Sequence, residues 1–209
     1  MPSRDYYEDL WQLVPEGHEP PYFKRRLSFL LERLGQDAGR VLDVGCGEGR
    51  FTRELACAGA RVVGVDVAEE PLRRARAQCP GLELRLIAEG ERWPFDDASF
   101  DAVWAGEVIE HVADTARWFS EVRRVLRPQG SLLLSTPAHA PLTRMRLALS
   151  ARAFAAHFDP CGEHLRFYDR RTLTGLLEEF GFHEISIAGA GGSPLAPAVM
   201  LAGARRRRF

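Results

Sequence analysis

Three glycines at alternate positions, Gly45, Gly47 and Gly49, follow directly after an apolar run at residues 40–44. Glycine is needed where a chain turns sharply or where a ligand must lie against bare backbone. The helical pattern that begins next offers unpaired N–H groups and a positive dipole end to an anionic ligand group. This strand–loop–helix sequence therefore predicts an α/β fold with a ligand site at the glycine loop.

Short β-type runs alternate with helical patterns through the central part of the chain. The runs lie at residues 40–44, 61–65, 82–87, 100–105 and 130–135. The clearest helix is expected near residues 115–126, where apolar side chains share one face and Asp114 is placed to cap the start. Strands that alternate with helices along the chain predict a mostly parallel sheet with helices on both faces.

The segment before this alternation is interpreted as a helical cap over residues 1–35. Residues 1–20 are aromatic and acidic and show no clean period. From Leu27 to Leu34 the apolar positions have helical spacing, and Gly35 can end that helix.

The segment after Pro137 breaks the regular rhythm, and residues 137–168 are interpreted as an inserted lid with one extra helix at 141–157. A helix and two strands are expected to complete a single domain over residues 1–209, near residues 170–180, 182–188 and 197–204. Arg205 to Arg208 are expected to form a solvated basic tail.

The charge balance excludes some classes of protein. The chain has 209 residues, with 28 basic and 29 acidic side chains and a formal net charge of -1. Such a chain lacks the broad positive field of most nucleic-acid binders. It has no apolar run of the length that a membrane span needs and no signal-peptide core, so a cytoplasmic location is expected. The four cysteines form no C-x-x-C pair and are expected to be free thiols.

The glycine loop differs from a dinucleotide fingerprint, whose third glycine would fall at Arg50. A nicotinamide oxidoreductase is therefore disfavoured. The next apolar run ends at Asp66, at the carboxyl end of a neighbouring strand. A carboxylate there can accept both ribose hydroxyls of an adenosine ligand, the alternative being an Asp that caps the following helix.

The sequence resembles the class I S-adenosylmethionine-dependent methyltransferases. The matching elements are the loop at residues 43–49, Asp66, Trp93-Pro94-Phe95 with Ser99-Phe100-Asp101, residues 107–111, and Leu126-Arg127-Pro128 with Gly130. The resemblance implies a Rossmann-like, seven-stranded sheet with a reversed last strand. It also implies S-adenosylmethionine as methyl donor and S-adenosylhomocysteine as product.

The same resemblance assigns a set of residues to the cofactor. Gly45, Gly47 and Gly49 would approach the methionine part with Asp43 beside them, and Asp66 would hold the ribose. Glu89-Gly90 occupies the place of an acidic-small pair near the adenine. Cys46, Val67 and Gly106 are assigned to the cofactor site on this basis as well.

Within the class, the chain is most similar to the ubiquinone-biosynthesis O-methyltransferases. The spacing from Arg25 to Asp66 can be matched without a gap. Arg25 then falls where that family places an arginine on the cofactor's carboxylate, a task suited to a bidentate guanidinium. The alternative is a solvated helix face that Arg25 shares with Lys24 and Arg26.

Residues 107–111 carry the candidate chemistry. Glu107, Glu110 and His111 are spaced i, i+3 and i+4, so they share a face if a helical turn begins there. We expect His111 to act as a general base. A divalent ion on all three residues is one alternative, since ubiquinone O-methyltransferases have a similar Glu-x-x-Glu-His segment associated with such an ion. The other alternative is that these three residues have structural or helix-capping roles.

The acceptor site is expected to lie in residues 1–26 and 137–168, which contain aromatic side chains and arginines. Such a surface suits a medium-sized, partly apolar acceptor that carries an anionic group. The predicted function is methyl transfer to a small molecule, most readily to oxygen, by in-line displacement. A non-catalytic S-adenosylmethionine-binding regulator or scaffold is the alternative. An RNA or protein methyltransferase is disfavoured, and no nucleic-acid partner is expected.

Overall fold

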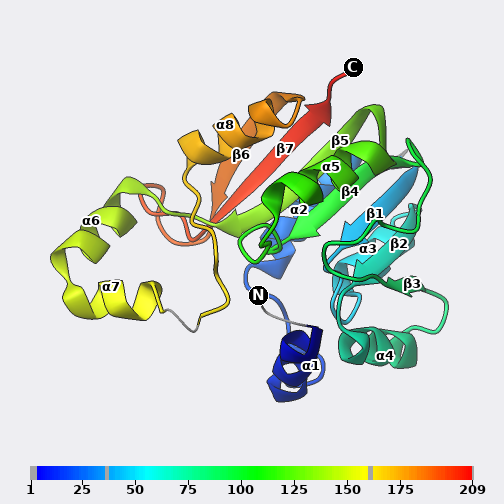
Figure 1. Ribbon diagram of the computed structural model, residues 1–209, viewed down its shortest axis with the longest axis horizontal. Coiled ribbons are helices and arrows are strands. Elements are labelled where there is room, and N and C mark those ends of the chain that lie inside the picture. The colour runs from blue at the N-terminus through cyan, green and yellow to red at the C-terminus, as the bar shows by residue number, and fades with distance from the viewer. Residues whose placement is uncertain (1–3, 36–37, 160–161, 209) are drawn as a thin grey trace.

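The sheet determines where the ligand site lies. The computed structural model describes residues 4–35, 38–159 and 162–208. Within these residues, seven strands form one sheet in the order β3-β2-β1-β4-β5-β7-β6 (Figure 1). The strands are β1 Arg40–Val44, β2 Arg61–Asp66, β3 Glu83–Leu86, β4 Phe100–Gly106, β5 Leu126–Pro137, β6 Phe182–Ala190 and β7 Val199–Arg206.

The direction of the strands confirms the predicted reversal at the end of the chain. The neighbouring pairs from β3 to β5 are parallel. The last strand, β7, is antiparallel to both β5 and β6. The carboxyl ends of β1, β2 and β4 therefore meet at one edge of the sheet, where ligands of open α/β folds bind.

Helices cover both faces of this sheet, as the alternating pattern predicts. They are α1 Arg4–Leu13, α2 Phe23–Leu34, α3 Arg50–Cys57, α4 Glu69–Gln78, α5 Thr115–Val125, α6 Pro141–Leu149, α7 Ala151–His157 and α8 Arg170–Glu179. One apolar cluster packs α5 and α8 on the sheet through Phe119, Val122 and Leu173. A second cluster packs α2 and α3 on the opposite face through Phe29, Leu30 and Phe51.

Aspartate side chains cap the starts of α5 and α8. Asp114 accepts the N–H of Arg117 at 2.9 Å, which confirms its predicted role at the start of α5. Asp169 accepts the N–H of Thr172 at 2.8 Å and forms a capping box at the start of α8. Such caps satisfy N–H groups that have no partner within the helix.

The predicted single helix at 141–157 is wrong, because two helices meet there at Ser150. The backbone of Ser150 is extended, with φ of -134° and ψ of 105°. Its hydroxyl accepts the N–H of Ala153, so it caps α7 directly after α6 has ended.

The connection between β3 and β4 also differs from the alternating pattern, since residues 87–99 form an irregular segment without a helix. Gly90 has a positive φ of 72° and Ala98 one of 51°. Arg124 of α5 donates to the carbonyl oxygens of Trp93 and Phe95 at 3.0 and 2.7 Å. Hydrogen bonds to a neighbouring helix therefore replace those that a helix in this segment would make.

Strand β7 includes the first two arginines of the predicted solvated tail. Arg205 pairs with Ser131 of β5, and Arg206 pairs with Phe182 of β6. Arg205 donates to the carbonyl of Gln129 at 2.9 Å. The tail prediction is therefore wrong for Arg205 and Arg206, because their backbones pair with neighbouring strands.

Of the predicted free thiols, Cys46, Cys57 and Cys79 are free, and Cys161 lies outside the described residues. No helix within residues 4–35, 38–159 and 162–208 is long and apolar enough to cross a bilayer.

Candidate functional site

A cavity of about 520 Å³ opens at the carboxyl ends of β1 and β2. Six of the residues that the sequence assigned to the cofactor or to catalysis line it, namely Gly45, Asp66, Val67, Glu89, Gly90 and His111. These residues come from four separate loops, so the fold brings together what the chain separates. The cavity has the size of a small-molecule or cofactor site.

The glycine loop forms one wall of the cavity, and its glycines carry no side chains there. Gly45 has a φ of 67°, and a Cβ added there would lie 2.6 Å from Cγ2 of Val108. A Cβ on Gly47, whose φ is 54°, would lie 3.0 Å from the ring of Trp11. Both positions exclude larger side chains by conformation and by space.

Asp66 joins the end of β2 to this loop. Its Oδ2 accepts the N–H of Gly47 at 2.9 Å, and its Oδ1 accepts the N–H of Ala68 at 3.1 Å. Burial raises the pKa of Asp66, and the hydrogen bonds from Ala68 and Gly47 oppose that shift. The carboxylate is therefore fixed in orientation at the cavity wall.

Four residues assigned to the cofactor lie in or under the loop and not on the wall of this cavity: Asp43, Cys46, Gly47 and Gly49. Asp43 is 1 % exposed and accepts the hydroxyl of Thr52 at 2.6 Å. Burial raises its pKa to about 7. The N–H of Cys46 donates to the carbonyl of Val65, and Gly49 is the N-cap residue of α3. These groups hold the loop in shape.

Neither Arg25 nor Arg26 lines this cavity, but the two arginines differ in burial, and Arg26 lies beside Gly106 at the end of β4. Arg25 is exposed, whereas Arg26 is 2 % exposed. The guanidinium of Arg26 lies 4.9 Å from the ring centroid of Phe51, and its Nη2 lies where a Cβ on Gly106 would stand. Arg26 Nε has no hydrogen-bond partner among the described residues. Burial lowers the pKa of Arg26, while Glu107, Glu110 and Asp43 oppose this.

The turn after β4 buries two carboxyl groups. Glu107 has a positive φ of 59°, and its Oε1 is buried without a partner among the described residues. Glu110 is 1 % exposed, and its Oε2 accepts the hydroxyl of Thr136 at 3.0 Å. Burial, with the charge of Glu107 as the next cause, raises the pKa of Glu110 to about 8.

His111 lines the cavity beside this turn. Its Nδ1 lies 3.1 Å from the carbonyl oxygen of Glu163, which fixes the ring. Burial, together with the nearby His164, lowers the pKa of His111 to about 4. The imidazole is therefore neutral at neutral pH. If Nδ1 carries the hydrogen, Nε2 is free to accept a proton.

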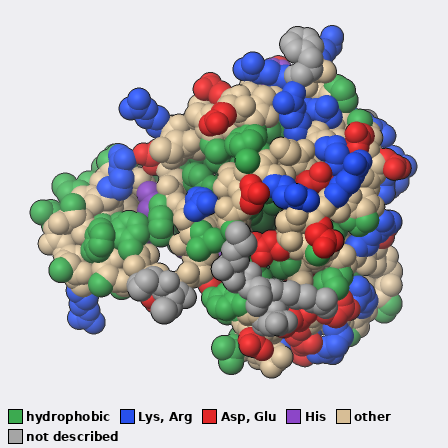
Figure 2. All heavy atoms as spheres, viewed as in Figure 1, with side chains coloured by type: hydrophobic (Ala, Val, Ile, Leu, Met, Phe, Trp, Pro, Cys, Tyr) green, Lys and Arg blue, Asp and Glu red, His purple; other side chains and the backbone are tan. Residues whose placement is uncertain are grey.

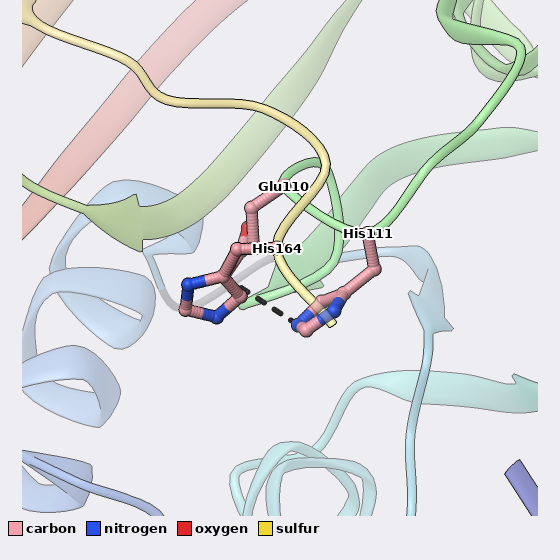
Figure 3. A group of neighbouring side chains, drawn as sticks. All are labelled: Glu110, His111 and His164. Carbon is pink, nitrogen blue, oxygen red and sulfur yellow. Dashed lines mark ion pairs between the residues drawn. The ribbon is translucent and has the colours of Figure 1, made fainter. Parts of the chain in front are cut away.

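The metal-ligand set differs from the one expected in the sequence. Ligand atoms of Glu110, His111 and His164 all lie within 4.8 Å of one another, and the three side chains converge from two segments (Figure 3). His164 stands in this group, and Glu107 lies outside it. Two imidazoles and a carboxylate could hold a divalent cation.

Helix α1 forms the roof of the cavity; the sequence placed the acceptor site in residues 1–26 but showed no clean helical period for residues 1–20. Tyr7, Leu10 and Trp11 line the cavity from this helix, and Val14 lines it from the residue after the helix ends. Their spacing of i, i+3, i+4 and i+7 is the signal that could have found it.

Arg74 of α4 fastens this roof. It donates to the carbonyl oxygens of Trp11 at 2.7 Å and Val14 at 2.8 Å, and to Oε1 of Glu48 at 3.1 Å. Glu8 of α1 accepts the N–H groups of Glu69 and Glu70 at the start of α4. The two helices are therefore joined mainly by polar contacts.

The predicted acceptor aromatics separate into two groups. Tyr7 and Trp11 line the cavity. Phe158 and Phe167 pack together within the lid segment, with ring centroids 4.6 Å apart, and Phe167 also contacts His139. His139 Nε2 lies 2.8 Å from Nε2 of His157, so a pair of imidazoles ties α7 to the segment after β5.

Comparisons with known proteins agree with this geometry. A family model described as "Methyltransferase domain" matches residues 16–187. A Mycolicibacterium smegmatis protein named "Probable S-adenosylmethionine-dependent methyltransferase" is 37 % identical over 171 residues, which cover 81 % of this chain and 62 % of that protein. A ubiquinone biosynthesis O-methyltransferase of Dinoroseobacter shibae is 34 % identical over 169 residues, covering 75 % of this chain and 65 % of the relative. The chain thus spans less than two thirds of the length of these relatives.

Solved structures share the fold. An S-adenosylmethionine dependent methyltransferase from Mesorhizobium loti superposes with a TM-score of 0.65 at 24 % identity, covering 88 % of this chain and 97 % of the other. Phosphoethanolamine N-methyltransferase 2 of Haemonchus contortus, solved with S-adenosyl-L-methionine, gives a TM-score of 0.69 at 18 % identity. That match covers 98 % of this chain and 57 % of the other.

Proposed function

The chain belongs to the class I S-adenosylmethionine-dependent methyltransferase family, and on this premise we propose that it transfers a methyl group from S-adenosylmethionine to a small-molecule acceptor. The observation that carries the proposal is the fixed Asp66 carboxylate at the wall of a cavity of about 520 Å³, beside the bare backbone of the glycine loop. The acceptor atom is proposed to be oxygen, supported by the name of the Dinoroseobacter relative.

The adenosine end of the cofactor fits the cavity as follows. Asp66 would accept the ribose hydroxyls, since the N–H groups of Gly47 and Ala68 hold its two oxygens in place. Val67, Glu89 and Gly90 continue the wall from this carboxylate. The missing Cβ at Gly45 lets Val108 pack against the loop, and both residues line the cavity beside the proposed ligand.

The amino-acid end requires a cation for its carboxylate, and Arg26 is proposed for that role in place of Arg25. Arg26 is buried beside Gly106 with an unpartnered Nε, whereas Arg25 is exposed. A buried donor without a partner is costly, and an anionic ligand group would relieve that cost. The donor set of the site therefore fits this cofactor.

The sulfonium of the bound cofactor supplies an activated methyl group, so the protein's main task is to align an acceptor oxygen opposite the departing sulfur. His111 is proposed to accept the proton of an acceptor hydroxyl at Nε2. Its lowered pKa keeps the ring neutral, and the contact of Nδ1 with the Glu163 carbonyl holds its orientation.

Titration calorimetry with S-adenosylmethionine, S-adenosylhomocysteine and NAD tests the cofactor assignment. Binding of both sulfur ligands without binding of NAD is expected, and failure to bind either sulfur ligand contradicts it. Incubation with methyl-labelled donor and a bacterial small-molecule extract then tests turnover. Binding without label transfer to any extract fraction would favour the alternative of a non-catalytic regulator or scaffold.

A further inference from the structure

A second cavity, of about 500 Å³, lies beside the amino end of β1, whereas the glycine loop follows the carboxyl end of that strand. Three arginines line this cavity: Arg40 of β1, Arg85 of β3, and Arg92 of the segment between β3 and β4. Basic and acidic side chains are interspersed over this side of the molecule, at the right in Figure 2. We call this space the arginine cavity, and the proposed methyl transfer does not use it.

Arg40 lines the arginine cavity without an acidic partner for its side chain. Its guanidinium lies 4.5 Å from the ring centroid of Phe100, and no ion pair joins it to another described residue. The carboxylate of Asp101 accepts the backbone N–H of Arg40, at 2.7 Å. Stacking on the Phe100 ring orients the flat guanidinium and leaves its N–H groups for an anion.

The ion pairs of the other two arginines are exposed to solvent. Arg85 donates to Glu83 at 2.6 Å, and the two side chains are 42 % and 50 % exposed. Arg92 donates to Asp97 at 3.1 Å, and both side chains are 68 % exposed. Exposed pairs of this kind contribute little to stability, so a more highly charged anion can displace these carboxylates.

The lining of the arginine cavity favours a phosphate ligand. Among the described residues, Asp96 is the only acidic one that lines it, so the lining carries a net positive charge. The planar fork of a guanidinium binds two phosphate oxygens at once. Trp93 and Phe95 also line the cavity but are 6 % and 8 % exposed, so neither offers a free ring face to a nucleobase. The three arginines therefore suit a diphosphate group, which carries more charge than a carboxylate or a sulfate.

The arginine cavity shares a wall with the cofactor cavity. Residues 87–91 line the cofactor cavity, residues 92–96 line the arginine cavity, and Trp93 lines both. The segment that contains these residues has no helix or strand of its own. An anion bound to Arg92 together with Arg40 and Arg85 would join this segment to β1 and β3.

We propose that the arginine cavity binds a diphosphate group, and that this ligand strengthens cofactor binding by holding residues 87–99 against the sheet. A ligand that orders a shared wall lowers the cost of ordering it for the second ligand, and the effect is reciprocal. The coupling rests on the proposed function, because it takes the neighbouring cavity to bind S-adenosylmethionine. Binding of the diphosphate does not rest on it.

Titration calorimetry of the full chain with inorganic pyrophosphate tests the binding site. We expect binding that weakens with salt, and sulfate should bind much more weakly. Arg40→Gln should weaken pyrophosphate binding about 10-fold, and Arg40→Gln with Arg92→Gln about 100-fold. UDP and UMP are titrated in parallel, since their base differs from the adenine of the cofactor. Binding of UDP would identify a nucleoside diphosphate as the ligand, and binding of pyrophosphate alone a free diphosphate.

The matched control is Arg53→Gln, which removes the same charge on the opposite face of the sheet. Arg53 of α3 is paired with Glu54 at 3.0 Å, and its side chain is 41 % exposed. Its pyrophosphate affinity should equal that of the unmodified chain, and circular dichroism should show that all variants are folded. The binding site is overturned if pyrophosphate does not bind, if Arg53→Gln weakens binding as much as Arg40→Gln, or if UMP or sulfate binds as tightly.

The coupling is tested by titrating S-adenosylhomocysteine with and without saturating pyrophosphate. Its affinity should rise at least about 5-fold with pyrophosphate, and the double arginine variant should lose this gain. An affinity that pyrophosphate leaves unchanged would overturn the coupling. If S-adenosylhomocysteine binds under neither condition, the proposed function and the coupling are both wrong, while the pyrophosphate titration still decides the arginine cavity.

Discussion

Oδ2 of Asp66 accepts the backbone N–H of Gly47 at a distance of 2.9 Å, and this bond ties the end of β2 to the loop that follows β1. The two residues are 19 positions apart in the chain. One carboxylate therefore stabilises the loop and also presents its remaining lone pairs to the cavity. The proposed contact with the ribose would therefore use the same oxygen atoms that hold the loop in place.

Replacing Asp66 with alanine should abolish binding of S-adenosylhomocysteine. The variant loses the acceptor for the ribose hydroxyls and also the partner of the Gly47 N–H. Asp66→Asn keeps one carbonyl oxygen, so it should retain weak binding. Titration calorimetry measures both, and equal affinity of Asp66→Ala and the unmodified chain would contradict the ribose assignment.

Replacing Arg26 with glutamine should weaken S-adenosylhomocysteine binding by at least about 30-fold, because a buried charge pair is lost. Binding of methylthioadenosine, which lacks the amino-acid carboxylate, should change little. Arg25→Gln is the matched control and should leave both affinities unchanged. If Arg25→Gln weakens binding and Arg26→Gln does not, the carboxylate of the cofactor binds at Arg25 and the assignment to Arg26 is wrong.

Replacing His111 with alanine should slow turnover by about 10²–10⁴-fold while S-adenosylhomocysteine binding is retained. A base with a lowered pKa stays neutral over a wide range, and here that pKa is about 4. Turnover of the unmodified protein should therefore remain level as the pH falls and be lost only as it approaches that value. An unchanged rate in the alanine variant would remove the role in proton transfer.

Asp43 should make the ligand-free protein less stable at high pH. Burial raises its folded-state pKa to about 7, well above its usual value. The folded state then binds more protons than the unfolded one between these values, so the stabilising contribution is lost as the pH rises through 7. Urea unfolding at pH 5 and pH 8 should show a loss of about 3 kcal/mol that Asp43→Asn does not share. Parallel pH dependence in both proteins would show that Asp43 is ionised throughout.

Phe119 should contribute strongly to stability, because it is fully buried and stacks on Phe180 with ring centroids 4.8 Å apart. Phe119→Ala should lower the free energy of unfolding by about 3–5 kcal/mol. Phe154→Ala, at an exposed position, should change it by less than about 0.5 kcal/mol. Denaturant unfolding compares the two, and similar losses would contradict the assigned core.

Much of the fold could be predicted because it depends on local signals. The five strands from residue 40 to residue 135 begin within a few residues of their predicted starts, since apolar runs bounded by turn residues define them. Asp114 was identified because an N-cap needs only its own helix. The break at Ser150 was missed, since alanine, arginine and leucine favour helix on both sides of it.

The burial of single side chains was less predictable, because one position along a helix decides whether a side chain is buried or exposed. Arg25 and Arg26 differ by one residue, and one residue rotates a side chain by about 100° around a helix. Arg26 shares the buried face of α2 with Phe23 and Leu30, and this spacing was the available signal.

His164 could not be found from sequence spacing, because a long-range backbone contact brings it to the site. The carbonyl of Glu110 accepts the N–H groups of Leu165 and Arg166 at 2.8 and 3.0 Å. These bonds place His164 beside His111, with ring centroids 4.9 Å apart. Only the folded chain shows that the lid segment completes this cluster.

The roof over the cavity, helix α1, has a consequence for how fast ligands exchange. The two apolar clusters of the sheet contain no residue of α1, whereas Arg74 and Glu8 join α1 to α4 through hydrogen bonds. Opening of α1 would exchange these hydrogen bonds for hydrogen bonds to water and would leave both clusters in place. We therefore expect the residence time of a bound cofactor to depend on the opening of this one short helix more than on the stability of the domain.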